Sequence, residues 1–368
     1  MSRVVVLIIL VCALNAAPAG AAERRVPQGW LGVTVDGPMT ADDDAEWDRM
    51  VPAGVESVRI AFRWYRLQPE AGTLDFSGSD ALVAAAARRG IAVLPVVEQT
   101  PAWASLHPGD LTAPPRDPAA VQSFLATLVA RYGPGGSFWA ERPELSPLPI
   151  RTWQIWNEPN LAGVWSERPY APSYVATLRA AAAGVRGADP GATVVLAGLV
   201  NRSWLALREL YKAGAGGLFD AVALHPYTRE PRNVLRLVRL ARREMRKHGD
   251  ATLPIWITEL SWPAAQSRSA KGKINRRFGI EVTAAGQARR LGDALARLAA
   301  ARKRLLIGRV SWYTWLSAEA GPSPFDWSGL RRVRGGRHVS VPALAVYRRA
   351  ARILEGCAKA HADARRCA

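Results

Sequence analysis

Two glutamates in this sequence of 368 residues, Glu158 and Glu259, lie at the ends of short apolar runs. Burying a carboxylate at such a place costs free energy unless polar partners surround it. Two carboxyl groups that face one another can divide the work of proton donor and nucleophile, or of acid and base, which is the chemistry that cleaves glycosidic bonds. The chain must then contain elements that bring these two distant residues together.

Short apolar runs alternate with longer stretches rich in Ala, Leu and Arg, which is typical of parallel strands joined by helices. Continuously apolar runs are expected of strands that are buried on both faces. The expected strands are eight runs, at 30–35, 57–64, 91–97, 152–156, 193–199, 221–224, 254–260 and 309–316. The expected helices lie between or after them, at 79–89, 118–132, 171–187, 231–248, 285–302 and 341–354.

This pattern predicts an α/β fold, a (β/α)8 TIM barrel formed by a single domain with long loops on its catalytic face. A doubly wound open sheet is the alternative, but 33–38 does not resemble the Gly-rich phosphate turn that usually follows its first strand. The functional groups of a barrel gather where its strands end. Glu158 follows the fourth expected strand and Glu259 lies at the end of the seventh, so we expect the two to meet across the barrel.

The segments around the two glutamates resemble the catalytic signatures of a large clan of (β/α)8 glycoside hydrolases, most closely family 39. In that clan the acid/base follows strand four and the nucleophile follows strand seven. The resemblance covers nearly all of the chain after its first residues. It rests on Trp-Gln-Ile-Trp-Asn-Glu-Pro-Asn at 153–160 and Trp-Ile-Thr-Glu at 256–259, with further matches at 64–69, 100–104 and 225–227.

The resemblance implies a role for each glutamate and for three supporting residues. Glu158 would protonate the leaving oxygen and later deprotonate water, while Glu259 would attack the anomeric carbon to form a glycosyl-enzyme. Asn157 would bond the 2-hydroxyl of the sugar. Arg59 and Tyr227 would hold Glu259 ionised, because a nucleophile must stay anionic. Retention of configuration predicts that the two carboxyl groups lie about 5–5.5 Å apart.

Four further residues are expected near the same end of the barrel. His225 would lie at the wall beside Glu259, with or without contact to the sugar. Trp315 would offer an aromatic floor for a sugar ring, although a core position is the alternative. For Trp103, a packing role and a role as a platform for a sugar ring are equally favoured. Glu98 follows the third strand, and either a surface role or a role in substrate binding is open to it.

The leading hypothesis is a retaining O-glycosyl hydrolase that acts on β-glycosidic bonds of an oligo- or polysaccharide. A single barrel with long loops favours endo action over xylosidase-like relatives that carry extra β-sandwich parts. The alternatives are a non-catalytic carbohydrate-binding barrel, a transglycosylase and, less favoured, a lyase or metal enzyme. No cofactor and no metal site are expected, since the few His residues lack ligand spacing.

The formal net charge of +18 favours acidic polymers in general, but no nucleic-acid-binding module is recognised, and nucleic-acid binding is not expected. The loop at 262–282 contains Lys271, Lys273, Arg276 and Arg277, which raises the hypothesis of an acidic glycan. A general richness in Arg explains the same charge and is the preferred reading.

The N-terminal residues 1–22 have the features of a signal peptide, with Arg3 before an apolar run and small residues near Ala22. An uncleaved anchor and, through Cys12, a lipoprotein are the alternatives. We therefore expect a secreted or cell-envelope protein without stable membrane insertion after cleavage. Residues 23–356 would form the catalytic domain and 357–368 a tail, in which Cys357 and Cys367 are either bonded or free. The oligomeric state is left open.

Overall fold

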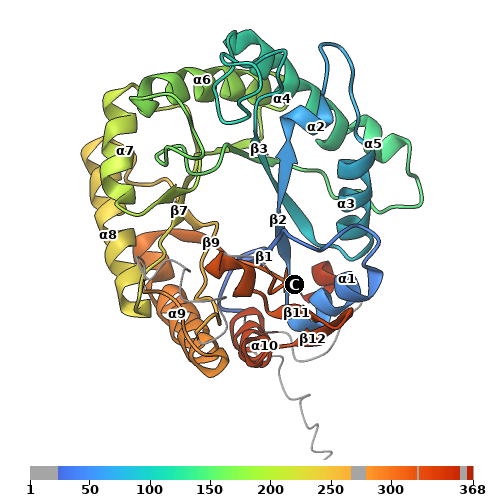
Figure 1. Cartoon of the computed structure of the whole chain (residues 1–368), viewed down its shortest axis with the longest axis vertical. Coiled ribbons are helices and arrows are strands. Elements are labelled where there is room, and N and C mark those ends of the chain that lie inside the picture. Colours follow the sequence, from blue (N-terminus) through green and yellow to red (C-terminus); the bar gives the residue numbers. More distant parts are fainter. Residues whose placement is uncertain (1–23, 267–278, 321–322, 357–362, 368) are drawn as a thin grey trace, which may run out of the picture.

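The computed structural model describes residues 24–266, 279–320, 323–356 and 363–367. Its centre is a parallel sheet that curls into a barrel with helices around the outside (Figure 1). The strands of this sheet are β1 Leu31–Val35, β2 Ser57–Arg63, β3 Ala92–Glu98, β4 Thr152–Ile155, β5 Thr193–Val195, β6 Leu199–Val200, β7 Val222–His225, β8 Ile255–Ile257 and β9 Ile307–Trp312.

The sheet closes because β5 and β6 are two parts of one barrel strand. The strand order is β5-β4-β3-β2-β1-β9-β8-β7-β6, which places these two parts at its ends. Isolated parallel bridges complete the ring, between Val195 and Ala221 on one side and between Asn157 and Gly198 on the other. All eight expected strands are present in the expected order along the chain, and the TIM-barrel prediction is confirmed.

Two of the helices that follow strands begin with a side-chain cap. Asp117 accepts a hydrogen bond from the amide of Ala119 and precedes Pro118, and Thr283 caps its helix in the same way. The helices are α1 Asp44–Met50, α2 Trp64–Leu67, α3 Ser77–Arg88, α4 Pro118–Tyr132, α5 Ser137–Ala140, α6 Tyr170–Ala188, α7 Ser203–Lys212, α8 Pro231–Lys247, α9 Ala284–Leu305 and α10 Pro342–Glu355, with short 3-10 turns η1 Val51–Ala53, η3 Pro324–Trp327 and η4 Ala364–Cys367.

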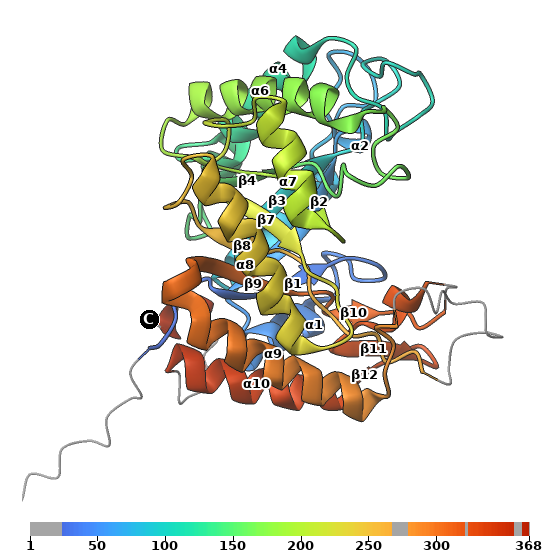
Figure 2. The same cartoon turned by 90° about the vertical axis from the view of Figure 1, so that its left-hand side faces the viewer.

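A small second sheet was not expected from the sequence. It consists of β10 Leu316–Ser317, β11 Arg331–Arg334 and β12 Arg337–Ser340, and Figure 2 shows it on the side away from the C terminus. The predicted strand at 309–316 therefore ends early, at Trp312. The buried guanidinium of Arg331 joins this sheet to α1 by two bonds to Glu46, at 2.9 and 2.6 Å.

Packed side chains fill the space beneath the expected site. A buried cluster inside the barrel contains residues from β3, β5, β7 and β8 and the turn before β7, namely Leu94, Val195, Ala221, Ala223 and Trp256. Within the described residues, none of the helices has the length and apolar character that crossing a bilayer requires. The signal peptide, Cys357 and the basic residues at 271–277 lie outside the described residues, so those predictions stay as stated.

Candidate active site

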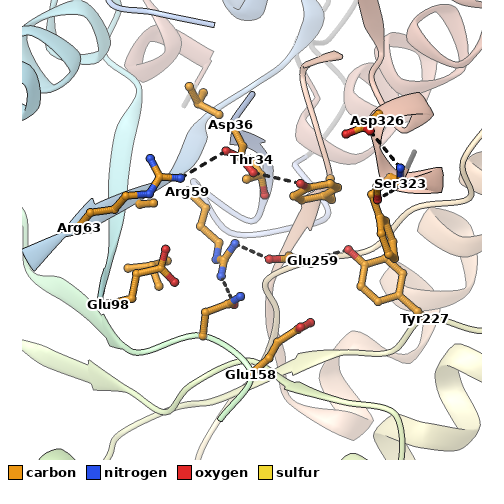
Figure 3. Close-up of a pocket in the computed structure, with 16 residues that line it drawn as sticks. Thr34, Asp36, Arg59, Arg63, Glu98, Glu158, Tyr227, Glu259, Ser323 and Asp326 are labelled. Atoms are coloured by element: carbon orange, nitrogen blue, oxygen red, sulfur yellow. Dashed lines mark hydrogen bonds and ion pairs between the residues drawn. The ribbon is translucent and has the colours of Figure 1, made fainter. Parts of the chain in front are cut away.

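The carboxyl ends of the barrel strands surround a cavity of about 270 Å³ (Figure 3). Side chains at every second position of β2 and β3 face it, because successive residues of a strand point to opposite sides. Its lining consists of Thr34, Val35, Asp36, Arg59, Ala61, Arg63, Val96, Glu98, Asn157, Glu158, Tyr227, Glu259, Tyr313, Ser323, Phe325 and Asp326. Both expected catalytic glutamates are therefore in one cavity.

Glu158 enters the cavity from a turn with unusual backbone geometry. Trp156 and Glu158 both have left-handed φ angles, 69° and 43°, which non-glycine residues rarely adopt and which cost about 1–3 kcal/mol each. Neighbouring backbone groups hold the turn in place. The amide of Trp156 donates to Val97 at 2.8 Å, and the amide of Glu158 donates to Gly198 at 3.1 Å. The strained turn aims this carboxyl into the barrel.

Glu259 follows β8 and is buried, with a partner on each carboxylate oxygen. Arg59 donates to Oε1 at 2.6 Å, and the Tyr227 hydroxyl donates to Oε2 at 2.8 Å, as Figure 3 shows. Burial raises the pKa of Glu259, but the positive charges of His225, when protonated, and of Arg59, together with these hydrogen bonds, outweigh burial. The pKa of Glu259 therefore falls below its ordinary value. This carboxyl is held as an anion.

The guanidinium of Arg59 also orients the neighbouring amide groups. Its Nη2 donates to Oδ1 of Asn157 at 2.7 Å, and its Nε donates to Oε1 of Gln154 at 3.3 Å. Because the Asn157 oxygen is occupied, its amide N–H groups are the part left to bond a ligand. Gln154 was not assigned a role from the sequence, although a buried polar residue within an apolar strand is a signal that could have identified it.

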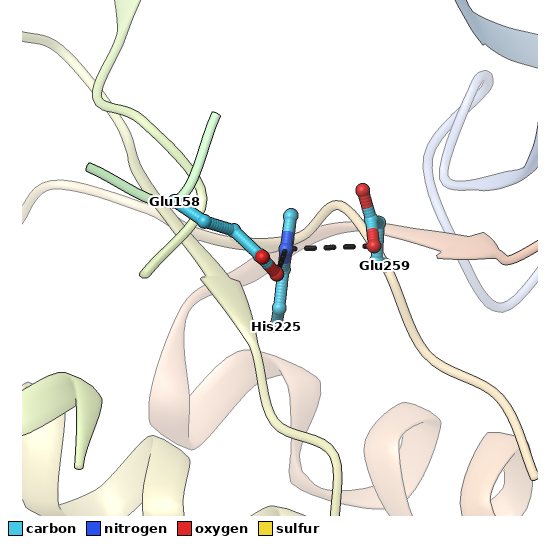
Figure 4. Close-up of side chains that lie close together, drawn as sticks. All are labelled: Glu158, His225 and Glu259. Atoms are coloured by element: carbon cyan, nitrogen blue, oxygen red, sulfur yellow. Dashed lines mark hydrogen bonds and ion pairs between the residues drawn. The ribbon is translucent and has the colours of Figure 1, made fainter. Parts of the chain in front are cut away.

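His225 lies beside Glu259, as expected, and between the two glutamates (Figure 4). Its Nδ1 is 2.7 Å from Glu158 and 3.5 Å from Glu259, and its Nε2 is 3.0 Å from the hydroxyl of Thr258. The side chain of His225 is completely buried. Thr258 precedes the proposed nucleophile in the matched segment 256–259, and no role was expected for it.

The distance between the two carboxyl groups is short. One oxygen of Glu158, one oxygen of Glu259 and a ring nitrogen of His225 all lie within 4.8 Å of one another. Such a group could in principle hold a metal ion. Arg59 and Tyr227, however, already bond the two oxygens of Glu259, which favours a role for this carboxylate as a stabilised anion.

The two tryptophans expected near the site lie outside the cavity lining, and the expectation for Trp315 is wrong. Trp315 is completely buried and donates its indole N–H to Glu46 at 3.0 Å, so it is a core residue and not a floor of the cavity. Trp103 donates to the carbonyl of Gln68 and packs edge-on against Trp64, but it does not line the cavity. The aromatic residue that follows the eighth barrel strand and lines the cavity is Tyr313.

A group of charged residues from β2, β3 and the turn after β1 forms the wall beside Arg59. Asp36 accepts from Tyr313 at 3.0 Å and lies 3.9 Å from Arg63, while Glu98 faces the cavity. Burial raises the pKa of Glu98 to about 7, although Arg59 and Arg63 oppose the change. The structure thus places Glu98 in the cavity, where it can reach a ligand.

The barrel and its paired carboxylates define the class to which the chain is similar in structure, a (β/α)8 barrel of the glycoside hydrolase type. Solved structures that resemble it include a family 39 glycoside hydrolase from Bacteroides cellulosilyticus WH2, with a TM-score of 0.66 and 18% identity over 90% of this chain and 64% of that one. This chain thus spans less than two thirds of that protein.

Two further structures share the fold. A monomeric β-xylosidase from Caulobacter crescentus CB15 matches with a TM-score of 0.61 and 19% identity, over 89% of this chain and 69% of that one. The family 53 catalytic domain from Ignisphaera aggregans matches with a TM-score of 0.57 and 19% identity, over 89% and 96%. No family model and no curated protein matches the sequence. The resemblance drawn from the motifs is confirmed at the level of the fold.

Proposed function

We propose that this protein is a retaining glycoside hydrolase that cleaves β-glycosidic bonds of an oligo- or polysaccharide by double displacement. The observation that carries the proposal is the approach of Glu158 and Glu259 to within 4.8 Å, oxygen to oxygen. Retaining enzymes need carboxyl groups about 5–5.5 Å apart, whereas inverting enzymes need about 6.5–9.5 Å to admit a water molecule. The short distance supports retention.

The environments of the two glutamates support a division of labour. In the first step, Glu259 attacks the anomeric carbon as the bond to the leaving oxygen breaks, and Glu158 gives its proton to that oxygen. In the second step, Glu158 takes a proton from water, which attacks the anomeric carbon and releases Glu259. Arg59 and Tyr227 stabilise Glu259 as an anion at the start and end of this cycle.

A second hollow beside the cavity supports endo action. It has a volume of about 310 Å³ and shares Asp36, Tyr313, Phe325 and Asp326 with the catalytic cavity. Phe325 packs against Tyr313 at a ring distance of 6.0 Å, so aromatic surface lies where the two hollows meet. A neighbouring sugar of a longer chain fits this place, and analysis of product length from a polysaccharide distinguishes endo from exo cleavage.

The proposal is tested by screening the purified protein against aryl glycosides and polysaccharides, with Glu259→Ala as control. We expect hydrolysis that the variant lacks, a first-formed product with the anomeric configuration of the substrate by NMR, and a covalent adduct on Glu259 after treatment with a fluorinated substrate analogue. An inverted product, or full activity of Glu259→Ala, would contradict the mechanism. Binding of glycans by the wild type without any turnover would indicate a carbohydrate-binding barrel.

We also propose that the protein is exported through its first 22 residues. The apolar run after Arg3 and the small residues up to Ala22 support this location. N-terminal sequencing of the protein recovered outside the cytoplasm tests it. A mature chain that begins near Glu23 is expected, and a protein that stays in the cytoplasm with Met1 intact would refute export.

A further inference from the structure

The buried imidazole of His225 has two hydrogen-bonding sides with different partners. On one side Nδ1 is 2.7 Å from Oε1 of Glu158, and on the other Nε2 is 3.0 Å from the Thr258 hydroxyl. The side chains of His225 and Thr258 are both completely buried. The ring therefore connects the proposed acid/base to a residue that the proposed reaction does not use.

The ring also has a fixed place against the backbone of Gly198. A Cβ atom on Gly198 would lie 2.1 Å from Nε2 of His225, closer than any real contact, so only glycine leaves room for the imidazole. The carbonyl of the same glycine accepts the amide hydrogen of Glu158 at 3.1 Å. One short segment thus fixes both the ring and the backbone of the residue that it contacts.

The hydroxyl of Thr258 can accept from Nε2–H or donate to an unprotonated Nε2, and Nδ1 then offers a lone pair or an N–H to Glu158. A neutral imidazole has one N–H and one lone pair, and the bond made by one nitrogen sets which nitrogen carries the proton. If Nε2–H donates to the Thr258 oxygen, Nδ1 presents its lone pair and accepts the proton of a protonated Glu158. Before the first step of a retaining mechanism, the acid/base must carry this proton.

The charges around the ring show why an uncharged partner matters. Glu158 and Glu259 both face Nδ1, and the ring of Tyr227 lies 6.4 Å away, edge-on. A carboxylate at Nε2 would add a third negative charge and favour the imidazolium, which holds its own proton at Nδ1. The hydroxyl of Thr258 adds no charge. Glu259 keeps Arg59 and Tyr227 as partners when the ring is neutral.

We propose that Thr258 is a positioning residue, whose hydroxyl bonds Nε2 of His225 and holds the ring where Nδ1 bonds the carboxyl of Glu158 and orients it toward the leaving oxygen. This inference rests on the proposed function of Glu158. Thr258 acts only through the imidazole, since its hydroxyl bonds Nε2 and is not part of the cavity lining.

The first test compares substrates that differ only in their need for a proton. Thr258→Val keeps the shape of the side chain but removes the hydroxyl. We expect kcat/KM to fall about 10–100-fold for an aryl glycoside with a poor leaving group, because that substrate needs a proton from Glu158. For a dinitrophenyl glycoside, whose dinitrophenolate leaves without a proton, we expect a fall of less than about 3-fold. Thr258→Ser should restore most of the activity on the poor leaving group.

Thr177→Val is the matched control, because it also removes a buried threonine hydroxyl, one that bonds the carbonyl of Ser173 in the outer helix α6. Its effect on kcat/KM should not depend on the leaving group. An equal loss on both substrates in Thr258→Val would mean that Thr258 is merely structural, and this result would overturn the proposal.

The second test does not require turnover, so it separates this proposal from the proposed function. The chain has five His, and ¹⁵N NMR of selectively labelled protein, with a His225 variant for assignment, reports the tautomer of His225 directly. We expect the Nε2 signal of a hydrogen-bonded ring in the wild type and a changed Nε2 signal in Thr258→Val. The same His225 signals in the wild type and in Thr258→Val would overturn the proposal, even if the protein is an active glycosidase.

Discussion

At the level of single residues, each carboxyl group of the site has its own set of partners. Glu259 has a guanidinium, a phenol and, at 3.5 Å, the imidazole that bonds Glu158 more closely. Burial and the nearby Glu259 hold the pKa of Tyr227 well above its ordinary value, so its hydroxyl keeps the proton that it donates. These differences in partners, and not the chemistry of glutamate itself, separate a nucleophile from an acid/base.

Removal of the cation beside Glu259 should affect both stability and activity. We expect Arg59→Met to lower the free energy of unfolding by about 3–5 kcal/mol, because it leaves a buried carboxylate without its ion pair. The activity should fall at least about 100-fold. Urea unfolding and kcat/KM measure these effects.

Arg63→Met is the matched control for stability, since Arg63 is partly exposed and lies 3.9 Å from Asp36. We expect a change below about 1 kcal/mol. If Arg59→Met were no more destabilising than Arg63→Met, the ion pair with Glu259 would not contribute the expected free energy to stability.

The hydrogen bond from Tyr227 should have a smaller effect than the ion pair. Tyr227→Phe removes one donor to a charged acceptor, which is worth about 1.5–3 kcal/mol, so kcat/KM should fall about 10–100-fold with the fold intact. Steady-state kinetics and circular dichroism check this. Unchanged kinetics would show that Tyr227 only packs beside Glu259.

The raised pKa of Glu98 predicts that the stability of the fold depends on pH. Its pKa rises from 4.5 to about 7, chiefly because burial disfavours the charge. The loss of folding free energy that comes from burying the charged carboxylate is absent below about pH 4.5, where the carboxyl is protonated whether the chain is folded or not. It grows to at most about 3 kcal/mol as the pH rises through 7. Glu98→Gln should therefore raise the Tm at pH 8 and leave it unchanged near pH 4.5.

A carboxylate with the opposite shift provides the control for Glu98. Hydrogen bonds from Arg131 lower the pKa of the exposed Glu141, so Glu141→Gln should not raise the Tm at pH 8. A higher Tm for Glu98→Gln at both pH values would point to better packing instead of relief of a buried charge.

At the level of elements, the ends of the strands carry the strain of the site. Four of the six left-handed residues other than glycine in the described part of the chain are Gln99 after β3, Trp156 and Glu158 around the end of β4, and Asn201 after β6; the other two, Leu306 and Glu319, lie elsewhere. The first four positions lie on the carboxyl edge of the sheet. Strain of this kind persists only where the surroundings hold it, and it clusters at functional sites.

Asn160 is one of the residues that hold the turn of Glu158. Its side chain bonds both backbone groups of Val200, with donation to the carbonyl at 3.0 Å and acceptance from the amide at 3.4 Å. Asn160→Ala should lower the free energy of unfolding by about 1–3 kcal/mol and reduce kcat more than it changes KM. Chemical unfolding and kinetics test this, with Asn233→Ala on the outer helix α8 as control. Equal effects of both variants would exclude a role for this link.

At the level of the whole molecule, the charge of the chain and the charge of the cavity are opposite. The chain has a formal net charge of +18. The cavity lining contains five acids against two arginines, and the arginines already pair with Glu259 and Asp36. The local field at the cleaved bond therefore does not follow from the total charge.

The acidic lining predicts poor acceptance of a negatively charged sugar at the cleaved position. For a neutral glycoside that the protein hydrolyses, the matching uronide with the same leaving group should react at least about 10-fold more slowly, because Asp36, Glu98 and Asp326 repel its carboxylate. Kinetics at low and high salt measure the effect. Faster cleavage of the uronide, weakened by salt, would support the acidic-glycan hypothesis instead.

The sequence alone predicted the barrel and its two glutamates because both depend on short-range patterns. Strands buried on two faces must be apolar along their length, and a carboxylate at the end of such a run is conspicuous. The same reasoning failed for Trp315, since the chain leaves the strand at Trp312 and turns this side chain toward Glu46. It also missed the small sheet, whose strands are two to four residues long and, in β11 and β12, contain arginine.

Only the tertiary structure decided how the groups at the strand ends pair. The contacts of His225 with Glu158 and Thr258, the space that Gly198 leaves for the ring and the entry of Glu98 into the cavity all join residues from different strands. Their geometry depends on how the closed barrel staggers its strands, which local sequence patterns do not encode. The amino-acid sequence thus determined which residues can react, and barrel closure determined which of them meet.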